Sequence, residues 1–380
     1  MRATRREFLA AAAAAPIISP ALLNVQDKAG VKAPVMGEGA YTYEAIHDWG
    51  QLPPQIKWGN THGVVEDAQG NIHIHHTVHA TSDSADTVVV FDRAGKFVRS
   101  WGKEFRGVAH GLHLQKEGGD EFLYLTVTAA GPKMTPQPEM HSVVVKATLK
   151  GDIVWKIQGP PDVDAYKPGP DEKPRPYNPT NLAIGPTGDV YVGDGYGSYY
   201  INQYTAKGEY IRSFGGRGSE PGQLLEPHGI WLDTRGGTTA SQAARSTKPP
   251  PTGPTGASAP VLVVADRRNN RLQRFSLDGT HLDFIPGFRL PCHFDQHEGL
   301  LVVPDLHGRV TLVDSHNTAV AHLGDSGDPN WNNPLRREPR EKFIPGRFIC
   351  PHGACFDRDG NIYVVEWVEV GRVTKLRKVA

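Results

Sequence analysis

Histidines at matching positions of a repeated pattern are the residues of this sequence best suited to metal chemistry. The pattern is a short turn followed by an apolar run, and it recurs six times along the chain. The matching position is occupied by His62, His110, Asn181, His228, His293 and His352. Imidazole is a common side-chain ligand of zinc and copper, so histidines repeated in this way predict a metal site.

Three of these histidines come from alternate repeats: His110, His228 and His352. Ligands spaced about 120° apart form a tripod that leaves a coordination position open for water or substrate. His62 and His293 come from the intervening repeats, and we expect them at the same site, around the metal or facing the substrate. A single such histidine would more commonly hydrogen-bond to nearby backbone in a water-filled channel, but the set of three favours a metal.

The repeats that carry the histidines predict an all-β, six-bladed β-propeller. Each repeat contains short apolar runs separated by Gly-rich or polar turns, which is the pattern of a small antiparallel sheet. In a propeller the first strand of each blade lines the central channel, so residues at one repeat position form a ring around the axis. The propeller is expected to cover residues 41–380, with a low-complexity surface loop at 234–260 that is rich in Ser, Thr, Pro and Gly.

The last blade needs a strand from the other end of the chain. The sixth repeat ends at Ala380 after its third strand, and residues 41–50 end in Asp-Trp-Gly, much like the Ser-Trp-Gly of the first repeat. An N-terminal strand that completes the last blade closes the ring and removes exposed strand edges. We therefore expect residues 41–50 to supply the fourth strand of the sixth blade.

Residues 1–33 are interpreted as a twin-arginine export signal followed by a linker. The motif Thr-Arg-Arg-Glu-Phe-Leu at residues 4–9 precedes an Ala-rich run that ends at Leu23. This run is too short and too weakly hydrophobic for a permanent membrane span. The prediction is a periplasmic or secreted protein that folds before export and can load a metal in the cytoplasm. The alternative is an N-terminal helix with a chance pair of arginines.

The charge balance argues against a nucleic-acid or anionic-membrane partner. Lys and Arg together number 41, as do Asp and Glu, whereas such partners require a basic excess. A small molecule or a peptide is the expected partner, and a closed, neutral propeller is compatible with a monomer. The three cysteines allow one disulfide at most. Cys292 and Cys350 precede ring histidines of adjacent blades, where they would form a bridge or offer a soft ligand that favours copper.

Two other sets of polar residues are interpreted as structural. Histidines on or just after the second strand of the first repeat are expected to form a packed or solvated strand face. Aspartates that end second strands are expected to pair with nearby arginines. The histidines are His73, His75, His76 and His79. The aspartates are Asp194, Asp266 and Asp305, and the arginines are Arg271 and Arg309.

Four stretches of blades three and four resemble the NHL-repeat propellers, and among them the peptidyl-α-hydroxyglycine α-amidating lyases. They are residues 178–183 (Asn-Pro-Thr-Asn-Leu-Ala), 191–196 (Tyr-Val-Gly-Asp-Gly-Tyr), 226–229 (Glu-Pro-His-Gly) and 265–273 (Ala-Asp-Arg-Arg-Asn-Asn-Arg-Leu-Gln). The resemblance extends over residues 41–380 and is sharpest in these two blades. It implies an NHL-like propeller with metal-dependent lyase activity.

The resemblance implies a zinc ion held by His110, His228 and His352, and a catalytic tyrosine that matches Tyr196. This tyrosine would take a proton from a substrate hydroxyl, and a C–N bond would break to release an amide and glyoxylate. A phenol near a divalent cation has a lowered pKa and can serve as a base near neutral pH. The Asp-Gly-Tyr-Gly sequence around Tyr196 is also an ordinary strand-to-turn sequence, so a structural role is the alternative.

The chain departs from the family pattern at three positions. The active-site arginine of blade one has no counterpart between residues 71 and 80, and Arg267 or Arg268 is expected to reach the channel mouth in its place. Cys350 stands where the family has a methionine. Gly353 stands where the family has an aspartate that helps to bind a structural calcium, so a Ca²⁺ site is weakened by the loss of one carboxylate. The resemblance therefore supports the family's fold and histidine tripod in this chain better than it supports the family's substrate.

Three functions are compatible with these residues. The first is a metal-dependent lyase acting on a small or peptidyl substrate at the channel mouth, for which an open tripod beside Tyr196 is expected. The second is a non-catalytic binding propeller with a structural metal, for which four or more protein ligands would close the site. The third is a copper-binding redox or carrier protein, which would hold copper and show a visible absorption band.

Overall fold

The computed structural model describes residues 33–128, 142–162, 166–167, 176–235, 259–327 and 334–379. The predicted export signal up to residue 32 and most of the predicted loop at 234–260 lie outside these ranges. Within the described ranges, no helix has both the length and the apolar character needed to cross a bilayer.

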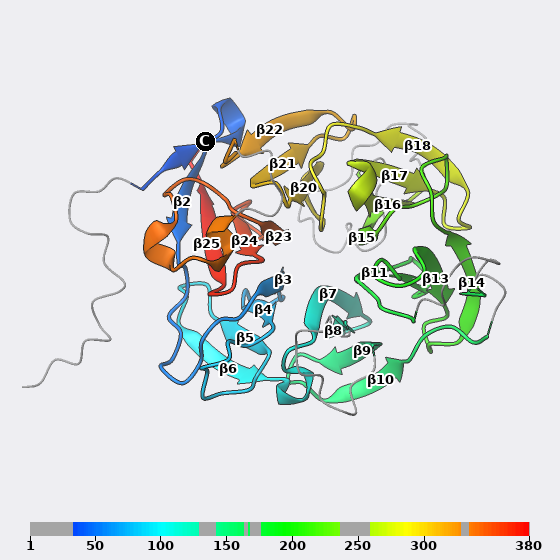
Figure 1. Cartoon of the computed structure of the whole chain (residues 1–380), viewed down its shortest axis with the longest axis horizontal. Coiled ribbons are helices and arrows are strands. Elements are labelled where there is room, and N and C mark those ends of the chain that lie inside the picture. The colour runs from blue at the N-terminus through cyan, green and yellow to red at the C-terminus, as the bar shows by residue number, and fades with distance from the viewer. Residues whose placement is uncertain are drawn as a thin grey trace, which may run out of the picture. The chain divides into compact units, whose positions relative to one another are not determined.

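Six antiparallel sheets stand around a central axis as the blades of a β-propeller (Figure 1). Five sheets have four strands each, and the sixth has five. In each blade the strands follow one another from the axis outward, as Figure 1 shows for β3 to β6. The all-β, six-bladed architecture predicted from the repeats is therefore confirmed.

The strands have the following bounds. Blade 1 contains β3 (Thr61–Glu66), β4 (Ile72–His76), β5 (Val88–Phe91) and β6 (Phe97–Trp101). Blade 2 contains β7 (Ala109–Glu117), β8 (Asp120–Val127), β9 (Val143–Thr148) and β10 (Ile153–Ile157). Blade 3 contains β11 (Asn181–Ile184), β12 (Val190–Gly193), β13 (Tyr200–Tyr204) and β14 (Tyr210–Gly215). Blade 4 contains β15 (Pro227–Asp233), β16 (Val261–Asp266), β17 (Arg271–Phe275) and β18 (His281–Ile285).

Blade 5 contains β19 (Asp295–His297), β20 (Leu300–Asp305), β21 (Arg309–Val313) and β22 (Ala319–Leu323). Blade 6 contains β23 (Pro351–Phe356), β24 (Ile362–Glu366) and β25 (Arg372–Lys378), together with β2 (Tyr43–His47) and β1 (Val35–Met36). Short 3-10 turns connect some strands: η2 (Gly39–Tyr41), η3 (Lys103–Phe105), η5 (Arg267–Asn269), η6 (Pro334–Arg337) and η7 (Arg340–Lys342).

β2 closes the ring by completing blade 6. It runs antiparallel to β25, with Tyr43 opposite Lys378 and His47 opposite Thr374. Tyr43 and Ala45 are buried in the apolar cluster between blades 5 and 6. The predicted closure by an N-terminal strand is therefore confirmed. The sequence did not predict β1, which pairs with the outer side of β2.

The apolar core is divided among the interfaces between neighbouring blades. Between blades 1 and 2, for example, Val88 and Val90 of β5 share a cluster with Leu123 and Leu125 of β8. Every blade has a neighbour on each face, so its middle strands are buried on both sides, and β5 is buried along its whole length. This double burial explains why these strands read as unbroken apolar runs in the sequence.

Buried ion pairs fix the ends of two second strands, as the sequence suggested. Arg271 Nε lies 2.7 Å from Asp266 Oδ2 in blade 4, and Arg309 Nε lies 2.7 Å from Asp305 Oδ2 in blade 5. Asp194 of blade 3 instead accepts hydrogen bonds from a tyrosine and a serine hydroxyl. These contacts agree with the structural role that the sequence indicated for the aspartates.

Candidate metal centre

The inner strands of four blades contain a β-bulge at the ring histidine. In β15 of blade 4, Pro227 pairs with Asp266 and Ile230 pairs with Val264, so the segment around His228 has one residue more than its partner. Similar register shifts occur at His62, His110 and His352. A bulge re-aims the side chain it carries, so these histidines can turn toward one another at the axis.

The imidazoles of His110, His228 and His352 meet at the axis. Their ring centroids lie 4.9 Å apart for His110 and His228, 4.9 Å for His110 and His352, and 4.7 Å for His228 and His352. His62 joins them, with centroids 4.8 Å from His110 and 4.6 Å from His352. His293 is also buried, and lies close enough to act electrostatically on His110 and His352. The structure therefore brings together the histidines that the repeats singled out.

One nitrogen of each tripod histidine is fixed by the backbone of the next blade. Nδ1 of His110 bonds to Thr180 O at 2.7 Å, Nδ1 of His228 to Cys292 O at 2.7 Å, and Nδ1 of His352 to His62 O at 3.0 Å. A carbonyl can only accept, so Nδ1 carries the proton and Nε2 keeps its lone pair. Metal-binding histidines are commonly oriented in this way. Among the described residues, Nδ1 of His62 and of His293 has no hydrogen-bond partner.

The glycine after each tripod histidine makes room for the carbonyl that orients it. A Cβ would lie 2.8 Å from Thr180 O on Gly111, 2.8 Å from Cys292 O on Gly229, and 2.4 Å from His62 O on Gly353. Real Cβ atoms essentially never approach other atoms closer than 3.0 Å. The His-Gly pairs of blades 2, 4 and 6 therefore share one arrangement: the glycine leaves space for the carbonyl oxygen that hydrogen-bonds to the histidine.

Replacing Gly229 by alanine should weaken metal binding by about 10- to 100-fold, the usual effect of disturbing a group that orients a metal ligand. The new methyl group would displace Cys292 O, and His228 Nδ1 would lose its acceptor. Titration of the metal-free protein with zinc measures the affinity. Gly119→Ala is the control, because a Cβ there meets nothing within 4 Å. Equal affinities for the two variants would contradict this account of the His-Gly pair.

Within the part of the chain that the structure describes, two overlapping sets of side chains could hold a metal ion. They are His62, His110 and His352, and His228, Cys292 and His352, and within each set the ligand atoms lie within 4.8 Å of one another. The predicted tripod of His110, His228 and His352 is neither of these sets but draws its members from both, so it stays a prediction. Buried imidazole nitrogens and a sulfur suit zinc or copper better than the hard cations Ca²⁺ and Mg²⁺. A side chain at Gly353 would collide with His62 O, and the weakened Ca²⁺ site predicted from this glycine stays a prediction. The residues present therefore fit Zn²⁺ or copper.

Burial keeps the histidines uncharged near neutral pH. It lowers the pKa of His110 to about 3. Burial also holds the pKa of His228 and of His352 well below the usual range, and nearby charged groups add to this effect. An uncharged imidazole can bind a metal without first losing a proton.

Tyr196 stands over the histidines in the turn between β12 and β13. Its hydroxyl lies 3.3 Å from Nε2 of His110 and 3.1 Å from Nε2 of His228, and it accepts a hydrogen bond of 3.2 Å from Arg267 Nη2. Burial raises the pKa of Tyr196 to about 12, although the Arg267 cation acts in the opposite direction. The residue remains 36% exposed, so the side chain borders both solvent and the centre.

A buried carboxylate holds Arg267 against Tyr196. Glu226 accepts hydrogen bonds from Arg267 and from Arg268, and it is only 5% exposed. Its backbone is left-handed, with φ of 64°, a conformation that is uncommon for a residue with a side chain. The side chain of Arg268 is 52% exposed, so Arg267 is the arginine that reaches the centre. Sequence analysis missed Glu226, whose signal was an acidic residue directly before a Pro-His pair.

No disulfide joins Cys292 and Cys350 in the structure. The bridge considered from the sequence is therefore not formed. Cys292 belongs to one of the two ligand sets. Cys350 belongs to neither set and shares an apolar cluster with Phe343, Ile349 and Val368. The soft-ligand alternative therefore applies to Cys292.

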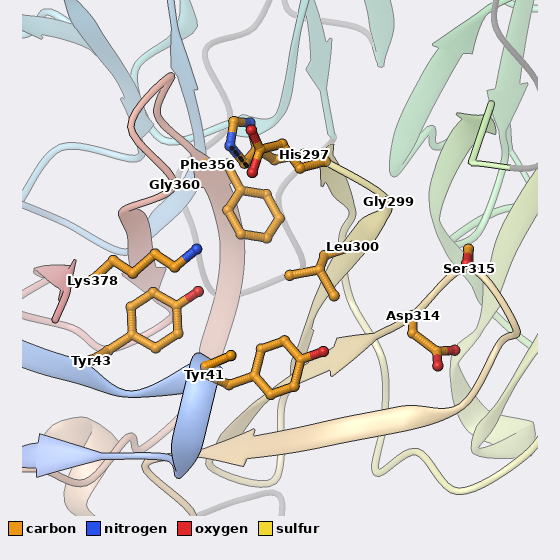
Figure 2. Close-up of a pocket in the computed structure, with 12 residues that line it drawn as sticks. Tyr41, Tyr43, His297, Gly299, Leu300, Asp314, Ser315, Phe356, Gly360 and Lys378 are labelled. Carbon is orange, nitrogen blue, oxygen red and sulfur yellow. Dashed lines mark ion pairs between the residues drawn. The ribbon is translucent and has the colours of Figure 1, made fainter. Parts of the chain in front are cut away.

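A separate pocket of about 310 Å³ lies away from the histidines, between blades 5 and 6 (Figure 2). It is lined by Phe356 at the end of β23, whose opposite end carries His352, and by His297 at the end of β19. Figure 2 shows Tyr41 and Leu300 at the same pocket. None of the predicted site residues lines it. The channel centre is therefore the candidate functional site.

No protein-family model matches the chain. The chain is similar to peptidyl-α-hydroxyglycine α-amidating lyase 1 of Drosophila melanogaster, with 27% identity over 347 residues that cover 82% of this chain and 56% of the relative. It is also similar to peptidyl-glycine α-amidating monooxygenase of Mus musculus, with 24% identity over 366 residues that cover 86% of this chain and 32% of the relative. The chain thus spans about half or less of the length of these relatives.

A solved streptogramin B lyase has a similar fold. It superposes with a TM-score of 0.51 at 13% identity, over 90% of this chain and 99% of that chain. Likeness at this identity concerns the fold alone. Together with the sequence relatives, it shows an NHL-like, six-bladed β-propeller that resembles peptidyl-α-hydroxyglycine α-amidating lyase.

Proposed function

We propose that this propeller is a metal-dependent lyase that acts on a small or peptidyl substrate at the channel mouth. The observation that carries the proposal is the convergence of the Tyr196 hydroxyl with Nε2 of His110, Nε2 of His228 and Arg267. A base, a cation and metal ligands within hydrogen-bond reach of one atom are the parts that such an elimination needs. The distant relationship to amidating lyases supports the same reaction.

The metal of this proposal is Zn²⁺, held by His110, His228 and His352, with His62 and His293 beside them. When bound, zinc would polarise a substrate oxygen and lower the pKa of a nearby hydroxyl. The Nδ1 hydrogen bonds of the three tripod ligands keep their Nε2 atoms available.

Tyr196 and Arg267 perform the proton transfer and the orientation of the substrate. Deprotonated Tyr196 takes the proton of the α-hydroxyl, and the carbon that bears this hydroxyl becomes the aldehyde carbon of glyoxylate. The C–N electron pair passes to nitrogen, which takes this proton back from Tyr196 and leaves as the amide. Arg267 is a fixed cation beside the tyrosine oxygen, suited to bind a carboxylate of the substrate.

Turnover of a peptidyl-α-hydroxyglycine tests this proposal. The zinc-loaded protein is expected to release peptide amide and glyoxylate in equal amounts, at a rate at least about 100-fold above the metal-free protein. Amide is followed by chromatography and glyoxylate by a coupled assay, with a buffer control for spontaneous breakdown. A fully zinc-loaded protein that gives only the buffer rate would overturn the proposed reaction.

A copper-binding redox protein is the second candidate, and one ligand set favours it. His228, Cys292 and His352 form a two-histidine, one-cysteine set, which is the donor set of electron-transfer copper sites. An intense visible absorption band in the copper-loaded protein, without lyase turnover, would support this candidate. A non-catalytic binding propeller is left if neither metal binds in stoichiometric amount.

The proposed setting is the periplasm or the extracellular space, reached in a folded state by the twin-arginine route. The support is the sequence of residues 1–33, with its paired arginines and short Ala-rich run. A monomer that binds a small molecule or a peptide, and no nucleic acid, fits the balanced charge of 41 basic and 41 acidic residues.

A further inference from the structure

Cys292 is held rigidly at the wall of the metal centre. Its backbone N–H donates to Pro304 O at 2.9 Å, and its carbonyl accepts from Nδ1 of His228 at 2.7 Å. The residue is fully buried, with no exposed surface. The backbone that orients His228 is thus the backbone that carries the Cys292 side chain.

The Cys292 sulfur lies within reach of two tripod histidines. Its Sγ and the ligand nitrogens of His228 and His352 are all within 4.8 Å of one another. At a tetrahedral zinc, sulfur and nitrogen ligands are ~3.6 Å apart. The three atoms would therefore have to approach one another by at most about an ångström to share one metal ion.

The surroundings of the sulfur leave it available as a ligand. Its hydrogen-bond contacts are with the Leu290 carbonyl at 3.4 Å and with Arg267 Nη1 at 3.9 Å. Both contacts are long and weak, as expected for a thiol. The Arg267 cation beside the sulfur would balance the negative charge of a metal-bound thiolate.

We propose that the Cys292 thiolate is a ligand of the channel metal, together with His228 and His352. The inference rests on the proposed metal centre and refines its ligand set. With His228 and His352 it makes a three-ligand set of two nitrogens and one sulfur, which would leave a coordination position open for substrate, as at a catalytic zinc. A thiolate also selects zinc or copper over harder cations.

Cobalt substitution and X-ray absorption test the assignment. The full-length protein loaded with Co²⁺ is expected to show a thiolate-to-cobalt charge-transfer band in the near ultraviolet. Cys292→Ser should bind the same amount of Co²⁺ through its histidines and lack this band. Cys350→Ser is the matched control, because Cys350 is buried but in neither ligand set, and it should keep the band. The zinc-loaded wild-type protein should show one sulfur neighbour at about 2.3 Å.

The outcomes separate this inference from the proposed function. Stoichiometric Co²⁺ without a charge-transfer band, or zinc with nitrogen and oxygen neighbours alone, overturns the Cys292 assignment and leaves the histidine centre intact. Failure of the wild-type protein to bind either metal overturns both. A band that persists in Cys292→Ser and disappears in Cys350→Ser would assign the thiolate to the other cysteine. The X-ray absorption result on the wild-type protein needs no variant, so misfolding of Cys292→Ser does not obscure it.

Discussion

Replacing His110, His228 and His352 together by alanine will reduce bound zinc from about one ion per chain to less than about 0.1, because three imidazole ligands are lost at once. The wild-type protein should be exported in its native manner and purified without chelators or a His tag, and its metal measured by elemental analysis. Lyase turnover should fall with the metal. Circular dichroism and thermal unfolding establish that the variant still folds.

The control for this variant is a histidine outside the channel. The side chain of His316 is 86% exposed, and His316→Ala should keep full metal content and activity. Retention of zinc by the triple variant would show that the metal is held elsewhere in the chain, and the tripod would be wrong. No zinc or copper in the wild-type protein would favour a binding platform over both metal-dependent functions.

The fold could be predicted from the sequence because propeller blades are nearly local. Each blade is a meander of consecutive strands, so its apolar runs and turns appear in order along the chain. The pairing of an N-terminal strand with the last blade was the one long-range contact that the prediction needed. The Asp-Trp-Gly ending of residues 41–50 provided it, and β2 pairs with β25 as expected. The short β1 was missed because a two-residue strand has no detectable period.

The candidate site was predicted in part, and the missing parts depend on contacts between blades. The position within the repeat identified the histidines, because residues at the same position of each blade lie close together around the propeller axis. Repeat position does not show that Thr180 O, Cys292 O and His62 O are the acceptors that fix the tripod. Their role follows from the close approach of neighbouring inner strands, which the glycines allow.

Glu226 and Cys292 show why single residues near the motifs were harder to assign. Each directly precedes a recognised ring histidine or Pro-His pair, and sequence position alone does not show where such a side chain points. The left-handed backbone of Glu226 directs its carboxylate toward Arg267. An isolated antiparallel pairing of Pro291 with Asp305 positions the backbone next to Cys292, whose side chain belongs to a candidate ligand set. These orientations decide which arginine acts, because Arg268 shares the same carboxylate and remains half exposed.

Tyr196→Phe should lower kcat for peptidyl-α-hydroxyglycine by about 10²- to 10⁴-fold, the usual contribution of a general base. The substitution removes one oxygen, which contacts His110, His228 and Arg267. The three histidines keep their backbone acceptors, so zinc content should stay at the wild-type level. Steady-state kinetics on zinc-loaded protein, with metal analysis of the same sample, measures both quantities.

The combination of lost turnover and retained metal is what distinguishes a base from a supporting residue. Tyr210→Phe is the matched control, because it removes a hydroxyl that bonds to Ser213 Oγ at 3.0 Å on β14, the outermost strand of blade 3. That variant should keep kcat within about twofold, as expected for a change remote from the site. If Tyr196→Phe also kept its kcat, another group would have to take the proton. If it lost zinc and activity together, the hydroxyl would support the metal centre, and the chemistry would have to rest on Arg267 and the metal.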